Sequence, residues 1–480
     1  MGVMNYTLLM PLIILAVTSL LCIILIAIKR NHLLTGLVAM AGIVAAFVAN
    51  VSIAGMPDLP AKIGVMFIID NFAAFFIGLI LAGSLAVTAI SMGYLSQHKE
   101  KSEEFFVLIL LATLGGLVLV ISNHFISFFL GLETLTVSLY ALIAYHHSQS
   151  RQIEAALKYL ILAAVSSAFL LFGIAIIYAA TGTMEFAMLS AVNFQSTAPG
   201  LMLAGLAVLI VGIGFKLAVV PFHMWTPDIY QGASAPVTSF IATVSKGGMF
   251  ALLLRFFTVF DIYRYPSLIL VFTIIAIASM FTGNWLALLQ TNVKRILAYS
   301  SIAHLGYLLV AFLAGGKLGP EAATFYLVAY FITTIAAFGV VGILSKSDRE
   351  AEEIDDYKGL YWRRPFIATI FTAMLFSLAG IPLTAGFLGK FYVVAAGVDS
   401  TRWLLVICLL INSAIGLFYY LRLVVAMFSK IEASVDIKEQ ALGFGGSAVI
   451  TILLILLVWF GVFPAQIFEI IHRSVSAIGY

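Results

Sequence analysis

The chain has 480 residues, of which 63% are hydrophobic and 10% are charged, and its formal net charge is +3. Soluble proteins carry roughly 25% charged residues, so this composition excludes a soluble domain, and the small net charge argues against nucleic acid as a partner. Its two cysteines stand apart in apolar runs, and the chain contains no CxxC, HExxH, GxGxxG or Walker motif. The sequence therefore predicts no metal, no iron–sulfur cluster and no other cofactor bound by this chain.

Long apolar runs dominate the chain from its first residues. A membrane-spanning helix needs about 20 apolar residues. The first run lacks a basic segment and an A-x-A-like end, so we expect it to be a span and not a cleaved signal. The sequence predicts an all-α polytopic membrane protein, with 1–480 as a single membrane domain. Its fourteen predicted spans are roughly 4–28, 33–52, 67–94, 105–121, 123–145, 153–180, 202–229, 236–257, 267–285, 295–315, 321–345, 366–395, 402–428 and 446–463.

Lysine and arginine are distributed unevenly between the loops. Loops after odd-numbered spans hold fourteen of them, including Lys294, whereas the other loops and the C-terminal tail hold six, including Arg255. Because positive loops stay in the cytoplasm, we expect both termini on the periplasmic side of a bacterial inner membrane. The polar stretch 345–364 is then a solvated cytoplasmic loop. Five basic residues are left inside the membrane region: Lys158, Lys216, Lys246, Lys390 and Arg422.

The stretch 214–249 combines buried charge with helix breakers. It carries Lys216 and Lys246 within apolar sequence, and Pro221, Pro227 and Pro236 interrupt its helices. A lysine at mid-membrane costs about 2.5–3.5 kcal/mol on insertion scales. Broken helices are tolerated at that depth only against protein or a water-filled cavity. The combination predicts an ion path through the membrane.

A second interrupted helix repeats this pattern. Residues 380–386 read GIPLTAG and precede Lys390, five spans after the first break. Five is an odd number, so two such repeats would have opposite topology, as in many transporters. We therefore expect two inverted five-helix repeats, about 105–257 and 267–428, with broken helices 7 and 12. Segments 1–94 and 446–480 would flank them.

Several other polar residues lie within predicted spans. Glu133 is near the middle of the fifth span, and a buried carboxylate needs a partner or a proton; we expect it to form a switching pair with Lys216, although a pair that only locks helix packing is the alternative. Lys158 follows Glu154 by four residues, so it belongs either to the path or to an ordinary contact along one helix. His223 and His304 are candidate proton relays or hydrogen-bonded structural residues. Asp70 is expected to cap the third span.

Three segments point to a known family. GLETLTVSLYAL around Glu133, GFKLAVVPFHMWTPDIYQGASAPVTSF around Lys216 and LAGIPLTAGFLGKFYV around Lys390 resemble the antiporter-like subunits of respiratory complex I, the proton-pumping NADH:quinone oxidoreductase. The likeness extends over nearly the whole chain. Lysine at position 390 and the short tail are most similar to the N-type branch of the family.

The resemblance implies a passive membrane subunit that holds one proton channel along Glu133, Lys216, Lys246 and Lys390. NADH, flavin, iron–sulfur clusters and the quinone site would belong to partner subunits. The chain would work beside other membrane subunits and lipids, not alone. A subunit of a multisubunit sodium/proton antiporter is the alternative, and a self-standing carrier of an organic solute is a third class with less support from the residues.

Overall fold

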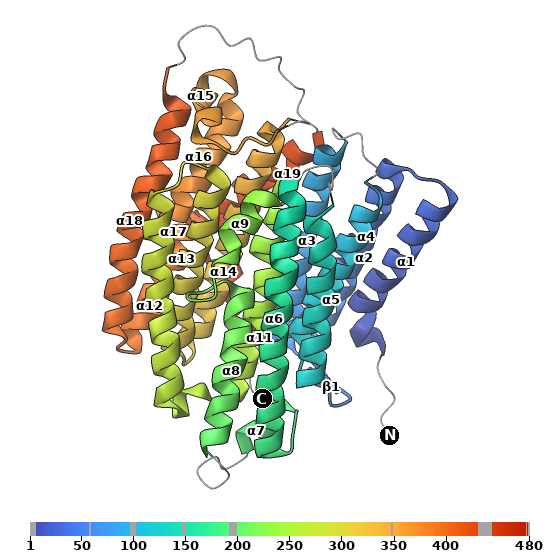
Figure 1. Cartoon of the computed structure of the whole chain (residues 1–480), viewed down its shortest axis with the longest axis vertical. Helices are drawn as coiled ribbons and strands as arrows, with labels where there is room; N and C mark the ends of the chain where they lie inside the picture. The colour runs from blue at the N-terminus through green and yellow to red at the C-terminus, as the bar shows by residue number, and fades with distance from the viewer. Residues whose placement is uncertain are drawn as a thin grey trace.

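The computed structural model describes residues 6–56, 59–96, 102–145, 150–191, 199–346, 349–430, 444–476 and 478. Long helices run side by side in one bundle (Figure 1). The α-helices are α1 (Met10–Ile28), α2 (His32–Ile53), α3 (Asn71–Leu95), α4 (Glu104–Ile121), α5 (Phe125–Ile143), α6 (Ser150–Thr181), α7 (Phe186–Ala191), α8 (Pro199–Leu217), α9 (Trp225–Gly232), α10 (Ala235–Phe240), α11 (Lys246–Val259), α12 (Pro266–Leu288), α13 (Val293–Ala314), α14 (Leu318–Leu344), α15 (Leu360–Arg363), α16 (Pro365–Ala379), α17 (Ala385–Asp399), α18 (Trp403–Phe428), α19 (Phe444–Val462) and α20 (Ala465–Val475).

The predicted spans reappear as helices. Thirteen helices in the described part of the chain are long and apolar enough to cross a membrane. The twelfth predicted span is two shorter helices, α16 and α17, as expected for a broken helix, because Gly380 ends α16 in a left-handed conformation (φ +88°) and Pro382 follows it. The membrane fold expected from the sequence is thus confirmed, with this span divided in two.

One small sheet departs from the all-α expectation. Strands β1 (Ala61–Ile63) and β2 (Phe67–Ile69) pair antiparallel between α2 and α3. Directly after β2, the side chain of Asp70 accepts a hydrogen bond from the Ala73 amide at 2.7 Å, which confirms its predicted role as a helix cap. In Figure 1, β1 and α7 lie at one end of the bundle and α15 lies at the opposite end.

The centre of the bundle is formed by α11, α13 and α14. In the segments Ala235–Val259 and Val293–Ala314, 94% of an 18-residue stretch long enough to cross a membrane is buried inside the protein. In Gly445–Val462, at the periphery, only 22% of such a stretch is buried. The helices that carry Lys246 and His304 are therefore shielded from lipid by the rest of the protein.

Several helix pairs are packed closely through glycine. A Cβ on Gly115 of α4 would lie 2.8 Å from the Gly131 carbonyl of α5, and a Cβ on Gly283 of α12 would lie 2.7 Å from the Tyr299 carbonyl of α13. Helices α6 and α8 approach in the same way, since a Cβ on Gly173 would lie 2.9 Å from the Gly205 carbonyl. The repeats 105–257 and 267–428 and their inverted relation stay a prediction.

The polar stretch after α14 is more ordered than expected. Residues 349–364, called the strap below, cross the ends of several helices. Glu353 forms an antiparallel bridge with Asn292 at the start of α13, and the Ile354 amide donates to the Thr291 carbonyl at 3.0 Å. Tyr357 is completely buried. Hydrogen bonding to the start of α13 thus holds part of the strap against the protein, whereas Asp355 and Lys358 are exposed, as expected for a solvated loop.

Candidate functional site: a row of buried lysines

The first predicted helix break lies between α8 and α9. Side chains satisfy part of the backbone that the break exposes: Trp225 Nε1 donates to the Phe215 carbonyl at 2.9 Å, and Ser279 Oγ accepts from the Val220 amide at 2.9 Å. Interrupted helices inside a membrane need such partners. Hydrogen bonds from neighbouring side chains therefore stabilise the interrupted helix in this conformation.

Lys216 occupies the last turn of α8, where a positive charge is favoured by the helix dipole. Its Nζ donates to Thr136 Oγ1 at 2.7 Å. Glu133 lies one turn earlier on α5, and its Oε1 accepts from Ser167 Oγ at 2.5 Å. Within the described residues Glu133 and Lys216 form no ion pair, because each bonds to a different hydroxyl group. The predicted pair is thus not in direct contact, and its switching role stays a prediction.

Lys246 is the second buried lysine of the row. It begins α11 directly after a π-helical turn, Ile241–Ser245, and such turns recur at functional sites. Its Nζ donates to Ser301 Oγ at 2.8 Å and lies 5.4 Å from the centre of the Tyr230 ring. Ser301 also hydrogen-bonds the Tyr330 hydroxyl at 2.7 Å. A fully buried ammonium is thus joined to neutral hydroxyl groups.

His304 continues the polar contacts along α13. Its Nδ1 contacts the Tyr326 hydroxyl, and its Nε2 lies 3.1 Å from the Tyr420 hydroxyl. Tyr420 in turn contacts Ser300. We had not singled out these tyrosines, but Tyr326 and Tyr330 stand four residues apart, as residues on one helix face do.

Lys390 lies at the second helix break, between α16 and α17. Its Nζ donates to the carbonyls of Leu378 and Ala379 and to Ser413 Oγ, each at 2.9 Å. Those carbonyls end α16, where backbone acceptors have no partner within the helix and a cation is favoured. The broken helix and the buried charge therefore stabilise each other.

Lys158 lies outside this row. Its side chain is about half exposed and pairs with Glu154 at 2.8 Å and Asp228 at 2.9 Å. The i,i+4 contact of one alternative is present, and the path role of Lys158 stays a prediction. Arg422 is also exposed and donates to the Leu288 carbonyl at 3.1 Å. Both side chains reach the protein surface, on helices long and apolar enough to cross a membrane, so their place inside the membrane region stays a prediction.

His223 lies in the first break and is buried. Neither of its ring nitrogens has a hydrogen-bond partner in the described part of the chain. His304, by contrast, has hydroxyl partners, and its ring lies 5.6 Å from that of Tyr330, which belongs to the polar contacts of Lys246. The relay roles of both histidines stay predictions.

Two residues that we had assigned to loops are buried. The Arg255 guanidinium forms two 2.8 Å hydrogen bonds with the Asp70 carboxylate, and both side chains are 2% exposed. Lys294 is completely buried and contacts Glu350 of the strap. Both loop assignments are wrong. Lys294 is thereby removed from the loops after odd-numbered spans and Arg255 from the other loops, so the excess of lysine and arginine in the first set remains. Lys99, Lys101 and Lys438, which also count toward the first set, lie outside the described residues.

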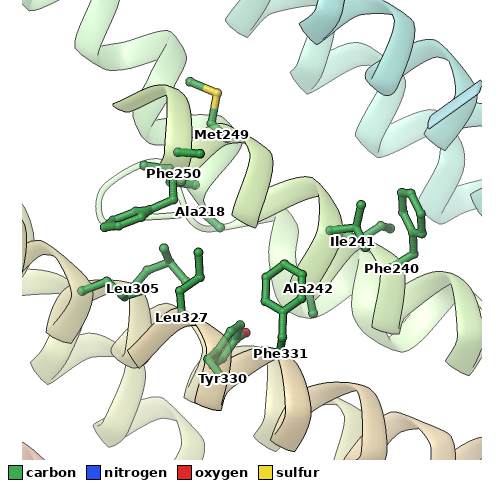
Figure 2. Packing of buried hydrophobic residues seen from close by; sticks show 14 of the residues in the cluster. Ala218, Phe240, Ile241, Ala242, Met249, Phe250, Leu305, Leu327, Tyr330 and Phe331 are labelled. Atoms are coloured by element: carbon green, nitrogen blue, oxygen red, sulfur yellow. The ribbon is translucent and has the colours of Figure 1, made fainter. Parts of the chain in front are cut away.

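Apolar side chains surround the polar row. Figure 2 shows part of this packing, with Tyr330 and Phe331 of α14 beside residues of α10, the π-helical turn and α11. A Cβ on Gly247 would lie 2.4 Å from Cζ of Phe331, so the ring packs directly on the backbone next to Lys246. The absence of a side chain at Gly247 permits this contact.

No group of three or more His, Cys, Asp or Glu side chains suited to a metal ion occurs in the residues that the structure describes. The groups of the site are the ammonium, imidazole and hydroxyl groups of the row and the Glu133 carboxylate beside it, all of which can bind and pass protons.

Comparisons with known proteins match the whole arrangement. A family model described as "NADH:quinone oxidoreductase/Mrp antiporter, TM" matches residues 122–416, which include both breaks. The NADH-quinone oxidoreductase subunit N of Ectopseudomonas mendocina is 42% identical, covering 97% of this chain and 96% of that protein.

Two solved structures of membrane complexes contain chains with a similar fold. A chain of respiratory complex I from Thermus thermophilus, with bound aureothin, has a TM-score of 0.82 and 31% identity, covering 96% of this chain and 98% of that one. A chain of the Mrp complex from Dietzia has a TM-score of 0.86 at 20% identity, covering 100% of this chain and 98% of that one. The second likeness concerns the fold alone.

Proposed function

Because the chain belongs to the NADH:quinone oxidoreductase/Mrp antiporter family of membrane proteins, we propose that it is an N-type subunit through which NADH-quinone oxidoreductase moves protons across the membrane. The relative that is 42% identical is such a subunit, whereas the Mrp chain shares the fold at 20% identity. This difference favours the oxidoreductase over the sodium/proton antiporter.

The observation that carries the proposal is the bonding of the three lysines. Lys216, Lys246 and Lys390 each donate to a hydroxyl group, and none has a carboxylate in contact within the described residues. Such an ammonium can lose its proton without leaving a bare carboxylate in the protein. Arginine keeps its proton at any accessible pH, so the buried Arg255 is suited to structure and the lysines to transfer.

Glu133 and His304 take the intermediate roles in this proposal. The Glu133 charge favours the protonated form of Lys216, and His304 links hydroxyl groups of α13, α14 and α18. Moving one charge against 100 mV costs about 2.3 kcal/mol, so an open wire would discharge the membrane. The Phe331 ring packs on Gly247 directly beside Lys246, and apolar packing at this point fits the need to prevent such a leak.

Partner subunits complete the reaction. In this proposal they bind NADH, flavin, iron–sulfur clusters and quinone, and quinone reduction there changes the protonation of this row. We place the protein in a bacterial inner membrane, with both termini in the periplasm and the strap in the cytoplasm. The remaining bias of lysine and arginine between the loops supports this orientation.

Lys246→Ala in the assembled complex tests the proposal. We expect NADH-driven proton uptake by inverted membrane vesicles to fall about tenfold, which corresponds to roughly 1.4 kcal/mol on the barrier, with quinone reduction falling alongside if coupling is tight. Lys317→Ala, at an exposed lysine, is the matched control. Wild-type proton uptake by an assembled Lys246→Ala complex would contradict the proposal.

A further inference from the structure

Lys294 is a fourth buried lysine, and the row described above does not include it. It lies in the first turn of α13 with no exposed side-chain surface. Its Nζ contacts a carboxylate oxygen of Glu350 and donates to the carbonyls of Gln231 and Ala233, at 3.1 and 2.6 Å. The ammonium thus bonds to the C-terminal end of α9, the second half of the first broken helix.

Glu350 reaches this lysine from the strap. Its other oxygen accepts from the Tyr94 hydroxyl at 2.7 Å and from the Ala235 amide at 2.9 Å. The carboxylate is 12% exposed, so it has contact with solvent on the strap side. Lys294 and Glu350 therefore form an acid–lysine pair in direct contact, between the solvent and the inside of the bundle.

The position of Lys294 on α13 relates it to Lys246. Ser301, the hydroxyl partner of Lys246, follows Lys294 by seven residues, which is two helical turns on the same face and about 10 Å along the axis. Tyr230 belongs to the same end of α9 that Lys294 binds, and its hydroxyl lies 3.4 Å from Ser301. Lys294 and Ser301 therefore lie on the same side of α13, with Lys294 nearer the strap.

We propose that Lys294 is the loading site on the strap side of the proton path, with Glu350 as the group that passes it protons from solvent, and that protons reach Lys246 through it. This inference rests on the proposed function of the lysine row. It adds an entry residue and assigns a role to the strap.

The proton count of the step is balanced. When Lys246 has given up its own proton and is a neutral amine, the Nζ of Lys294 releases a proton toward it past Ser301. The Glu350 carboxylate is then a buried charge without a counter-charge, which is strongly unfavourable, so it takes a proton from solvent. That proton moves from Glu350 to the neutral amine of Lys294. One proton has entered, one has reached Lys246, and the ion pair is restored.

A purely structural pair would predict different variant behaviour. Lys294→Arg keeps the charge and the hydrogen bonds to Glu350, but arginine does not release its proton. The double variant Lys294→Met with Glu350→Gln removes both charges, and replacing both partners of a buried pair is often nearly neutral for stability. Both variants would preserve a structural pair's function, whereas neither can load a proton.

The experiment uses the assembled complex in inverted membrane vesicles, with assembly checked on native gels. We expect Lys294→Arg and the double variant to take up protons at least about fivefold more slowly than wild type, a loss near 1 kcal/mol. Glu352→Gln is the matched control, because Glu352 belongs to the same strap and pairs with the exposed Arg151 at 3.0 Å. It should retain wild-type uptake.

Two outcomes overturn the inference. Wild-type uptake in either Lys294 variant would show that Lys294 carries no protons, and failure of Lys294→Arg to assemble would assign the pair to structure. Lys246→Ala measured in parallel separates this result from the proposed function: normal uptake there contradicts the row itself, whereas normal uptake confined to the Lys294 variants contradicts only the loading site.

Discussion

The Lys216 ammonium and the Thr136 hydroxyl lie 2.7 Å apart, and this hydrogen bond takes the place of the expected contact between Lys216 and Glu133. Thr136 follows Glu133 by three residues, so both lie on one face of α5. A neutral group therefore holds the lysine in this structure. In the proposed function, a change of charge on Glu133 would alter Lys216 without a salt bridge having to break.

Thr136→Val tests the contact. Valine has a similar volume but cannot accept the hydrogen bond, and a hydrogen bond to a charged group contributes about 1.5–3 kcal/mol. We expect proton uptake by vesicles to fall about tenfold or more, and Thr136→Ser to restore most of it. Thr134→Val, at an exposed threonine on the same helix, should change little. Unchanged uptake in Thr136→Val would remove Thr136 from the path.

Glu133→Gln tests the action at a distance. Glutamine keeps an oxygen that can accept from Ser167 Oγ but removes the charge. The protonated form of Lys216 then loses its support, so proton uptake should fall several-fold while the complex still assembles. Glu154→Gln is the control, since that exposed carboxylate pairs with Lys158 outside the row. Equal losses in both variants would argue against a special role for Glu133.

The sequence predicted the fold well because a membrane imposes strong rules. Apolar length, helix breakers and charged loops marked the spans and both interruptions before any contact was known. Glu133, Lys216, Lys246, Lys390 and His304 were found because charged or titratable groups are costly within an apolar span. Their positions near the middle of apolar runs can be read directly from the sequence.

The contacts between these residues were not predictable in the same way. Arg255 stands at the edge of an apolar run, so its pairing with Asp70 from another helix depends on tertiary packing. Glu350 looked like one acid among many in a polar stretch, and only the fold shows that it reaches Lys294. Ser301 and Tyr330 carry no charge, so nothing in the sequence distinguished them from other polar residues of the spans.

Gly247→Ala tests the packing beside Lys246. An added Cβ would lie 2.4 Å from Cζ of Phe331, and overpacking of this kind costs about 1–3 kcal/mol. We expect a lower thermal unfolding temperature of the purified complex, which Phe331→Leu in the same chain should partly correct. Gly342→Ala is the control, because a Cβ there has no neighbour within 3.5 Å. Equal stability of the two alanine variants would refute the packing argument.

Cysteine labelling tests the proposed orientation. Lys358 in the strap and Arg264 before α12 have well-exposed side chains, whereas the native Cys22 and Cys408 are buried. An impermeant thiol reagent added to intact cells lacking an outer barrier should modify Arg264→Cys and not Lys358→Cys. Inverted vesicles should give the reverse pattern. Labelling of Lys358→Cys from the periplasmic side would reverse the orientation.

Acid should weaken the anchoring of the strap only at low pH. Burial alone would raise the pKa of the Glu350 carboxyl, but the Lys294 charge and the hydrogen bonds from Lys294, Tyr94 and Ala235 outweigh it, so this pKa lies below its ordinary value. A lowered pKa means that the stabilising contribution is complete above the ordinary carboxyl value of about 4.3 and disappears as the pH falls through the folded value.

Thermal unfolding of the purified complex between pH 8 and pH 4 measures this effect. The difference in unfolding temperature between wild type and Glu350→Gln should stay constant down to about pH 5 and shrink below about 4.3. Glu352→Gln serves as the reference, because Glu352 belongs to the same strap and pairs with the exposed Arg151. If the Glu350→Gln difference instead disappeared between pH 7 and pH 6, the carboxyl would titrate well above the range set by its contacts, and the Lys294 pair could not anchor the strap at neutral pH.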